Sequence, residues 1–260
     1  MKIKLSIGRK LSIGFAILIV FFLISNIFTF TTFRKSQQIN DQNNNVYVPS
    51  MLLLMEFNSM IITSEKLIGN WIFIQSDDDS QDKKQLRELN SKVYPEIKSK
   101  LEEIAVHWDV EMQEKLEEIF NLVDLLFVTQ KYIMEELSSW ESYDDPMTLF
   151  LVRPMMEPGG DIVNYTSQIN EMLDELITTQ KNYVEQGYSQ MNESLEYLER
   201  LTIILTAVVI VLGILIAFFF IRSIVGPVNK LRFILNQMGQ GKVPTPNAMG
   251  RVIQKIKVIR

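Results

Sequence analysis

No cysteine occurs among the 260 residues, and histidine occurs once, at position 107. Without cysteine the chain has no disulfide and no thiolate nucleophile. His107 stands beside Trp108 in an acidic region and is expected to be a surface or packing residue, which leaves no base for a serine nucleophile. A glycine-rich phosphate loop is missing as well. We therefore expect no enzyme, no catalytic or metal-binding residue and no cofactor.

Acidic residues are missing from both ends of the chain. All 31 of them lie between residues 34 and 200, where 14 Lys and Arg accompany them, so this segment has a net charge of −17. The other 12 basic residues lie in the two tails. Nucleic acid is excluded as a partner of the acidic segment, because phosphate binding needs a basic surface.

Two charge-free apolar runs, 11–33 and 201–221, separate the acidic segment from the basic tails. About 20 apolar residues in a helix match the hydrocarbon core of a bilayer, so both runs predict transmembrane helices. The first run is longer than the core of a cleaved signal peptide, about 7 to 15 residues, and lacks a small-x-small site, so we expect a retained anchor. Because basic flanks stay inside, we predict a multi-pass protein of the cell (inner) membrane with cytoplasmic termini and with residues 34–200 outside. The lipid bilayer is then a partner, and the tails are basic enough to touch anionic headgroups.

The acidic segment is expected to be helical throughout. Pro49 and Pro95 interrupt the first two amphipathic stretches and are expected to kink each helix or restart it. With short connections between them, four such helices predict an all-α fold, an antiparallel four-helix bundle. In the first helix Leu53, Met60, Leu67 and Ile74 recur every seven residues. The residues at three- and four-residue spacing in the other helices are Leu86, Leu89, Val93, Ile97, Leu101, Ile104 and Trp108; Met112, Leu116, Ile119, Val123, Leu126, Gln130, Ile133 and Leu137; and Ile162, Tyr165, Ile169, Met172, Leu176, Thr179 and Tyr183.

The helical periodicity fails between residues 138 and 161. Asp145 followed by Pro146 is typical of a helix cap with proline at the first position, which predicts one short helix there. Three consecutive acids, at 77–79, are expected to form a solvated turn, since their spacing is not that of a calcium loop.

The irregular segment also holds the candidate ligand-binding residues, Arg153, Trp140 and Tyr143. Arg153 is a lone cation in an apolar, proline-flanked stretch, and a guanidinium is the natural contact for a small anion. Two alternatives stay open. In the first, Arg153 forms a salt bridge with an acid such as Asp144 or Glu157. In the second, the aromatic residues, with Trp71, belong to the core.

Beyond the second apolar run, a Gly226-Pro227 junction leads into a short amphipathic helix and then to a glycine-containing stretch, 239–243. A proline at this place fixes the start of a new helix. Heptad spacing of the residues that follow suits one strand of a parallel coiled bundle. This part of the chain resembles the start of a HAMP linker. The predicted signal-relay residues are Gly226, Pro227, Val228, Leu231, Leu235 and Met238.

With two spans and an external helical segment, the chain resembles the sensing half of a methyl-accepting chemotaxis receptor or a transmembrane sensor histidine kinase. The resemblance implies a homodimer, a small molecule or envelope protein bound outside, a helix displacement passed through the second span, and a cytoplasmic signalling partner. Residues 244–260 depart from the family, because they lack the acidic opening of a second HAMP helix. We expect a receptor truncated before its output domain.

The predicted parts are a basic cytoplasmic tail (1–10), a first transmembrane helix (11–33), an extracytoplasmic four-helix-bundle sensor domain (34–200), a second transmembrane helix (201–221) and a cytoplasmic partial HAMP-like linker (222–260). The alternative is a non-signalling, membrane-anchored interaction protein whose acidic external bundle docks another envelope protein.

Overall fold

The computed structural model describes residues 7–239, and within that range every regular element is helical. The predicted all-α class is confirmed. The chain divides into two compact units. The packed unit is Gln37–Met191, and the apolar unit combines Met1–Ser36 with Asn192–Arg260. The ends of both predicted cytoplasmic tails, including the doubtful second HAMP helix, lie outside the described residues.

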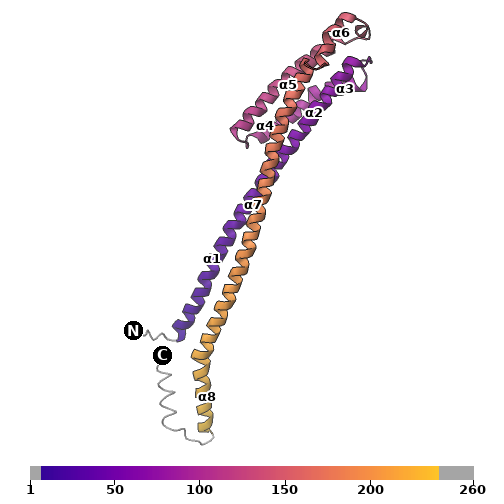
Figure 1. Ribbon diagram of the computed structural model, residues 1–260. Helices are drawn as coiled ribbons and strands as arrows, with labels where there is room; N and C mark the ends of the chain where they lie inside the picture. Colours follow the sequence, from indigo (N-terminus) through magenta and orange to yellow (C-terminus); the bar gives the residue numbers. More distant parts are fainter. Residues whose placement is uncertain (1–6, 240–260) are drawn as a thin grey trace. The chain divides into compact units, whose positions relative to one another are not determined.

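Thirteen elements follow one another along the described residues (Figure 1). They are α1 (Ile7–Gln42), η1 (Asn43–Tyr47), α2 (Val48–Phe73), α3 (Gln81–Glu88), η2 (Leu89–Val93), α4 (Tyr94–Ala105), α5 (Val110–Glu136), η3 (Glu141–Tyr143), α6 (Pro146–Val152), η4 (Arg153–Met156), α7 (Asp161–Phe220), η5 (Ile221–Val225) and α8 (Gly226–Gly239). Of the η elements, η1, η2 and η5 are π-helical turns, whereas η3 and η4 are 3-10 helices.

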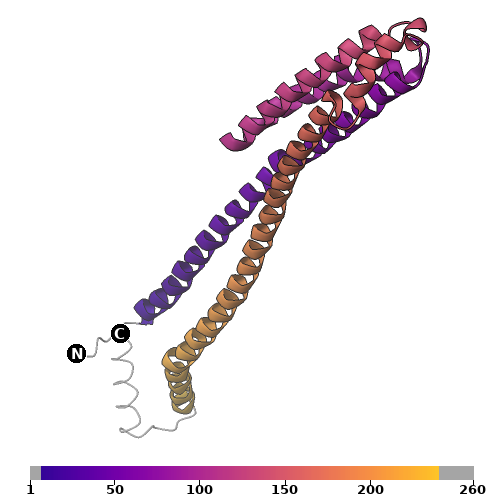
Figure 2. The ribbon, with the colours of Figure 1, turned by 45° about the horizontal axis from the view of Figure 1, so that its top comes forward.

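The packed unit is built around one hydrophobic core. Helix α2 packs against α3, α4 and α5, and the first part of α7 adds its apolar face to the same core. Figures 1 and 2 show α2, α4, α5 and the first part of α7 side by side. The apolar stripe predicted for the third helix is confirmed in full, because all eight of its residues are buried in α5 or at its end. These are Met112, Leu116, Ile119, Val123, Leu126, Gln130, Ile133 and Leu137.

Three prolines lie within continuous helical segments without ending them. Pro49, Pro95 and Pro227 each lie two residues after a π-helical turn, in the first turn of the next α-helical element. Proline offers no N–H to the carbonyl four residues back, and its ring crowds that carbonyl. A π-turn pairs residues five apart, as in the bond from the Val48 N–H to the Asn43 oxygen. The wider turn makes room for the ring, and the helix continues.

A π-turn also shifts the face that the following helix buries, because it holds one extra residue. After Leu89 the next buried side chain is Tyr94, five residues on, whereas Val93 is only partly buried. The tyrosine ring stacks on Phe57, with centroids 5.9 Å apart. Val93, which the spacing of three and four residues selects, is partly buried and packs against the core, while Tyr94 takes the buried position that a regular α-helix would not predict.

Two helices in the described range are long and apolar enough to cross a membrane, and their most apolar windows are not buried by other residues. Their charge-free apolar stretches, 11–33 and 201–221, belong to the apolar unit. Within that unit α1 and α7 pack closely, because a Cβ added at Gly14 would lie 3.6 Å from Ile216 Cγ2. Large apolar side chains elsewhere in the apolar unit, such as Phe22 and Ile214, are exposed.

Candidate functional site

The candidate ligand residues all fall in the irregular connection between α5 and α7, which the structure fills with η3, α6 and η4. The short predicted helix is confirmed as α6. Its cap is Asp145, whose carboxylate accepts hydrogen bonds from the N–H groups of Met147 and Thr148, both at 3.2 Å. Bonds from Thr148 and Met147 lower the pKa of this carboxyl. They satisfy amide groups that a helix of this length would otherwise leave free.

Tyr143 and Trp71 join the ends of two helices. The Tyr143 hydroxyl donates to the Trp71 carbonyl at 2.7 Å, in the last turn of α2. The Trp71 indole N–H donates to the Leu137 carbonyl at 3.2 Å, at the end of α5. Both rings are buried, and burial raises the pKa of Tyr143 to about 12. Two helix C-termini therefore have carbonyls paired by side chains, and Tyr143 belongs to the core, as the alternative interpretation had it.

Trp140 and Arg153 lie in a different environment from Tyr143, because both are exposed. Trp140 holds its loop in place through its backbone carbonyl, which accepts from Gln75 Nε2 at 3.0 Å. The salt bridge considered for Arg153 is not observed: of the ion pairs within residues 7–239, none includes this guanidinium. The three predicted residues therefore share one end of the packed unit but do not share a buried pocket.

Lys83 is a buried cation that the sequence analysis missed. The residue is 2% exposed, and its ammonium donates to the Ser76 carbonyl at 3.0 Å. The nitrogen lies 4.8 Å from the ring centre of Trp71 and 5.2 Å from that of Tyr143. Desolvation lowers the pKa of the lysine. Aromatic faces and a carbonyl replace part of the lost hydration, so Lys83 fastens the α2–α3 turn to the core.

The three consecutive aspartates form an exposed turn, as predicted. Two of them pair with bases on α3: Asp78 with Arg87, and Asp79 with Lys84 at 2.9 Å. Within residues 7–239, the structure gathers no group of three or more His, Asp or Glu side chains that could hold a metal ion. His107 lies exposed in the turn between α4 and α5, in agreement with the surface interpretation.

Polar side chains interrupt the core in the middle of the packed unit. Gln130 is fully buried, donates to Ser64 Oγ at 2.8 Å and accepts from Asn90 Nδ2 at 3.0 Å. Three elements, α2, η2 and α5, are thus joined by side-chain hydrogen bonds. A buried polar chain of this kind fixes the helical register, because any slip leaves its members unpaired.

A second polar contact joins η1 to α7 at the other end of the packed unit. Asn43 Nδ2 donates to the Val184 carbonyl at 3.2 Å, and Tyr47 packs on Tyr183 with ring centres 5.3 Å apart. Gly187 makes this approach possible, since a Cβ there would lie 2.3 Å from Asn43 Oδ1. The absence of a side chain at Gly187 leaves space on α7 for the Asn43 side chain.

The predicted relay residues lie in α8, which follows η5 and α7 without a break in the helix. Val228 and Leu235 are exposed. Gly226 donates its N–H to the Ile221 carbonyl and so closes the π-turn η5. The side chains of Pro227, Leu231 and Met238 lie outside what the structure describes.

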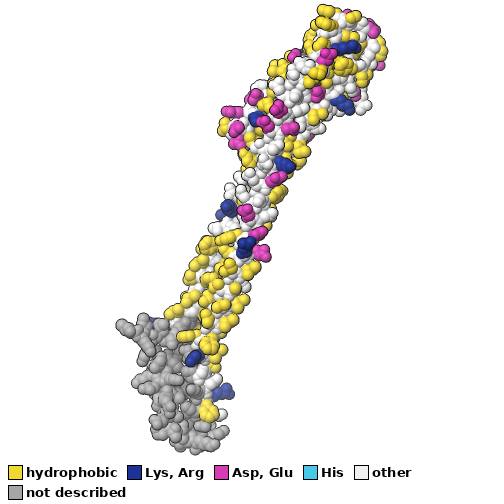
Figure 3. Space-filling view, in the orientation of Figure 1, with side chains coloured by type: hydrophobic (Ala, Val, Ile, Leu, Met, Phe, Trp, Pro, Cys, Tyr) yellow, Lys and Arg dark blue, Asp and Glu magenta, His cyan; other side chains and the backbone are white. Residues whose placement is uncertain are grey.

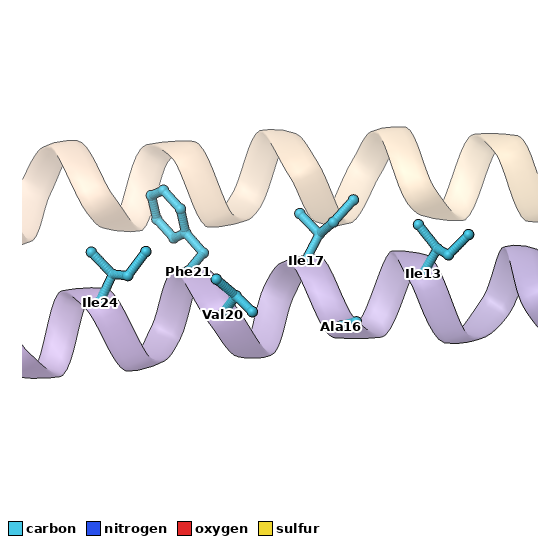
Figure 4. A pocket seen from close by; sticks show the side chains of 6 residues that line it. All are labelled: Ile13, Ala16, Ile17, Val20, Phe21 and Ile24. Carbon is cyan, nitrogen blue, oxygen red and sulfur yellow. The ribbon is translucent and has the colours of Figure 1, made fainter.

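One shallow pocket of about 370 Å³ lies on α1. Figure 4 shows its lining side chains, all from a single helix and all apolar. It offers no polar group to orient a ligand, so an acyl chain suits it better than a polar molecule. The lining residues are Ile13, Ala16, Ile17, Val20, Phe21 and Ile24.

The chemistry of these sites is that of packing, because buried side chains fasten helix ends together. No protein-family model, curated protein or solved structure matches this chain.

Proposed function

We propose that the protein is a homodimeric transmembrane sensor, in which an external helical domain binds a ligand or partner and passes a helix displacement through the second span. The observation that carries this proposal is the continuity of α7. It starts in the core at Ile162, includes an apolar stretch long enough to cross a bilayer, and leads through η5 into α8. A single uninterrupted helix can carry a displacement along its axis.

In this proposal the two apolar helices insert into the inner membrane with both termini in the cytoplasm. Support comes from the charge distribution, because the tails hold 12 basic residues and no acid, whereas residues 34–200 hold all 31 acids. The unburied apolar windows of α1 and α7 would then face lipid. Residues 222–239 would begin a HAMP-like linker on the cytoplasmic side, facing a signalling partner.

The external domain in this proposal is an antiparallel four-helix bundle. Its four members are α2, the combined α3–η2–α4, α5 and the first part of α7, which share one core. Three contacts between helices set the register: Asn58 to Asp174 at 3.1 Å, Tyr183 to Asp109 at 3.1 Å, and Gln130 to Ser64. The Asn58–Asp174 and Tyr183–Asp109 contacts and the buried bond from Asn43 to the Val184 carbonyl all involve α7 and would break if α7 slid alone. A shift of α7 therefore needs a ligand that binds the shifted state more tightly.

A second copy of the chain is proposed to pack along α2. Leu52, Met55 and Ile62 are exposed, and they repeat at heptad spacing with Ser59 between the last two. The same helix buries its opposite face in the core. A helix with apolar residues on two faces suits a position between its own core and a partner.

A reporter fusion tests the signalling proposal. The chain is joined after Gly239 to a kinase output domain. Two variants are made: one has a single residue inserted beside Gly226, and the other has Pro227 replaced. We expect kinase output to change at least severalfold, because an inserted residue rotates everything beyond it by about 100°. A matched insertion after Gly239, beyond α8, controls for the length of the fusion. Unchanged output for both Gly226 and Pro227 variants would count against a relay through α8.

The second candidate function is that of a membrane-anchored docking protein without signalling. It is favoured by the large apolar side chains exposed at the α6 end of the packed unit. The same fusion separates the two functions. If the protein only docks a partner, the kinase output of the fusion should not change when a residue is inserted at Gly226.

A further inference from the structure

The α6 end of the packed unit exposes large apolar side chains that its own core does not use. Phe150 is 73% exposed, Phe73 56% and Trp140 53%. In the packed unit, all of which the structure describes, these are the exposed Phe and Trp residues. Met147, Leu151 and Ile74 are exposed beside them in the sequence. Burying such large apolar side chains is favourable, so a partner that covers them would gain binding energy.

The elements that carry these residues are fastened to one another. Gln75, directly after Ile74, donates to the Trp140 carbonyl at 3.0 Å. Met156 of η4 reaches the backbone of α2, where a Cβ at Gly69 would lie 3.3 Å from its Cε. Figure 1 places α6 and the α2–α3 turn at the same end of the packed unit.

The apolar face of α6 is held outward by its anchoring. Val152 is fully buried and Leu149 packs against the core, so the opposite side of this short helix must face away. Asp145 caps its first turn through both carboxylate oxygens. Phe150 is therefore presented on a fixed helix, and a preorganised aromatic group is a strong binding contact because little entropy is lost on docking.

Charge around this surface is negative. The connection 138–161 holds five acids and one base, Arg153, and residues 77–88 at the same end hold five acids and three bases. Glu141, Asp144 and Asp145 are exposed in the residues that precede α6, and Glu157 follows η4. Backbone and Ser139 hydrogen bonds lower the pKa of Glu141, which stays ionised at neutral pH. Figure 3 shows apolar side chains over this end with both acidic and basic ones among them.

We propose that the α6 end is the docking surface for a second protein, whose contact face is an apolar pocket bordered by lysines and arginines. Phe150 and Trp140 fill the pocket, and the acidic side chains face the basic border. A protein of this class is the partner that the proposed sensor would bind. The proposal rests on the proposed function in one respect, that the α6 end lies outside the membrane.

The same charges argue against two other occupants. Two copies of the chain meeting through this end would bring two acidic surfaces together, and like charges across an interface are unfavourable. A bilayer rich in anionic lipid would repel the acids in the same way. A basic protein surface gains from both the apolar and the charged residues.

A peptide selection tests the proposal without a known partner. Full-length protein in lipid nanodiscs is panned against a phage-displayed library of random dodecapeptides, and winning peptides are synthesised for affinity measurement. We expect peptides with a positive net charge and aromatic or aliphatic residues. Phe150→Asp should weaken their Kd at least tenfold, whereas Val128→Asp, an equally exposed position on α5, should change it less than twofold. Affinity should also fall when salt rises, because the charges are exposed.

Neutral or acidic winning peptides, or peptides that bind the Phe150→Asp variant as tightly as the wild type, would overturn the proposal. Phosphatidylglycerol vesicles, and phage that display no peptide, are tested against the same nanodiscs as controls. Phe150-dependent binding to vesicles would assign the surface to lipid, and Phe150-dependent pairing of nanodiscs would assign it to a second copy. Either result would also overturn the proposal. The reporter fusion is independent of this selection, so a failure here leaves the signalling proposal to its own test.

Discussion

Single side chains decide how the helix ends of the packed unit are held. Tyr143 pairs its hydroxyl with the last turn of α2, and Trp71 pairs its indole with the end of α5. Lys83 lies over both rings and binds the Ser76 carbonyl that follows α2. Each carbonyl left without a partner in such a place would cost about 1 to 3 kcal/mol. The cluster thus links the end that carries α6 to the main core.

The titration of Tyr143 gives a test of this cluster. Its pKa is raised to about 12 in the folded protein, whereas an unfolded tyrosine has a pKa of about 10. The folded state therefore keeps the proton longer, and the contribution of Tyr143 to the free energy of unfolding is full below pH 10 and lost as the pH rises to about 12. Tyr143→Phe should cost about 1 kcal/mol at pH 8, and its disadvantage should vanish by pH 12.

Urea unfolding of the full chain in detergent micelles, followed by tryptophan fluorescence at pH 8 to 12, measures this difference. Tyr188→Phe removes the hydroxyl of an exposed tyrosine of α7 and should stay within about 0.5 kcal/mol of the wild type throughout. A Tyr143→Phe cost that is the same at every pH would contradict the buried hydrogen bond.

At the scale of elements, the three pairs of π-turn and proline are the most regular feature. Each pair keeps a helix continuous where proline would otherwise break it, at the cost of one extra residue in the turn. In the second helix of the packed unit the extra residue sets which side chain reaches the core. Tyr94 then meets Phe57, Phe120 and Phe127.

Removing the extra residue of η2 tests the pairing directly. Ser91 is exposed and is the middle residue of the turn. Deleting Ser91 alone should destabilise the protein by about 3 kcal/mol, because Pro95 would then lie inside a regular α-helix. Deleting Ser91 together with Pro95→Ala should restore the free energy of unfolding to within about 1 kcal/mol of the wild type. Equal losses for the single and the double variant, seen by the same urea unfolding, would show that the π-turn has no such role.

How far the sequence could predict each element depended on what its buried face contains. In α5 that face is apolar except for Gln130, and every predicted residue is buried. In α7 the buried face includes Thr166 and Gln180, which an apolar pattern does not detect, so Tyr165 and Thr179 were selected one residue too early. Spacing also could not reveal a π-turn, since it assumes a constant number of residues per turn.

The candidate site was less predictable than the helices. The composition of the 138–161 segment correctly located the irregular end and the cap of α6, because capping depends on adjacent residues. Whether Tyr143 or Trp140 is buried depends on contacts with α2, which adjacent residues do not specify. One feature of the sequence indicates that Lys83 is buried: it lies three residues before Leu86, on the buried face of the helix. A lysine is normally taken for a surface residue, so this spacing alone did not predict its burial.

At the scale of the whole molecule, the proposal depends on the side of the membrane that each part occupies. Absence of cysteine makes this directly measurable, because a single introduced thiol is the only one in the chain. Ser167, on α7 in the packed unit, and Asn229, on α8, are both exposed. Under the proposed topology the first is extracytoplasmic and the second cytoplasmic.

The most direct test of the proposed sensor is labelling of Ser167→Cys and Asn229→Cys with a membrane-impermeant maleimide in spheroplasts, before and after permeabilisation. The account predicts that Ser167→Cys is labelled in intact spheroplasts and that Asn229→Cys is labelled only after the membrane is opened. Labelling of Asn229→Cys in intact spheroplasts, or protection of Ser167→Cys until permeabilisation, would contradict an external sensing domain joined through α7 to the cytoplasm.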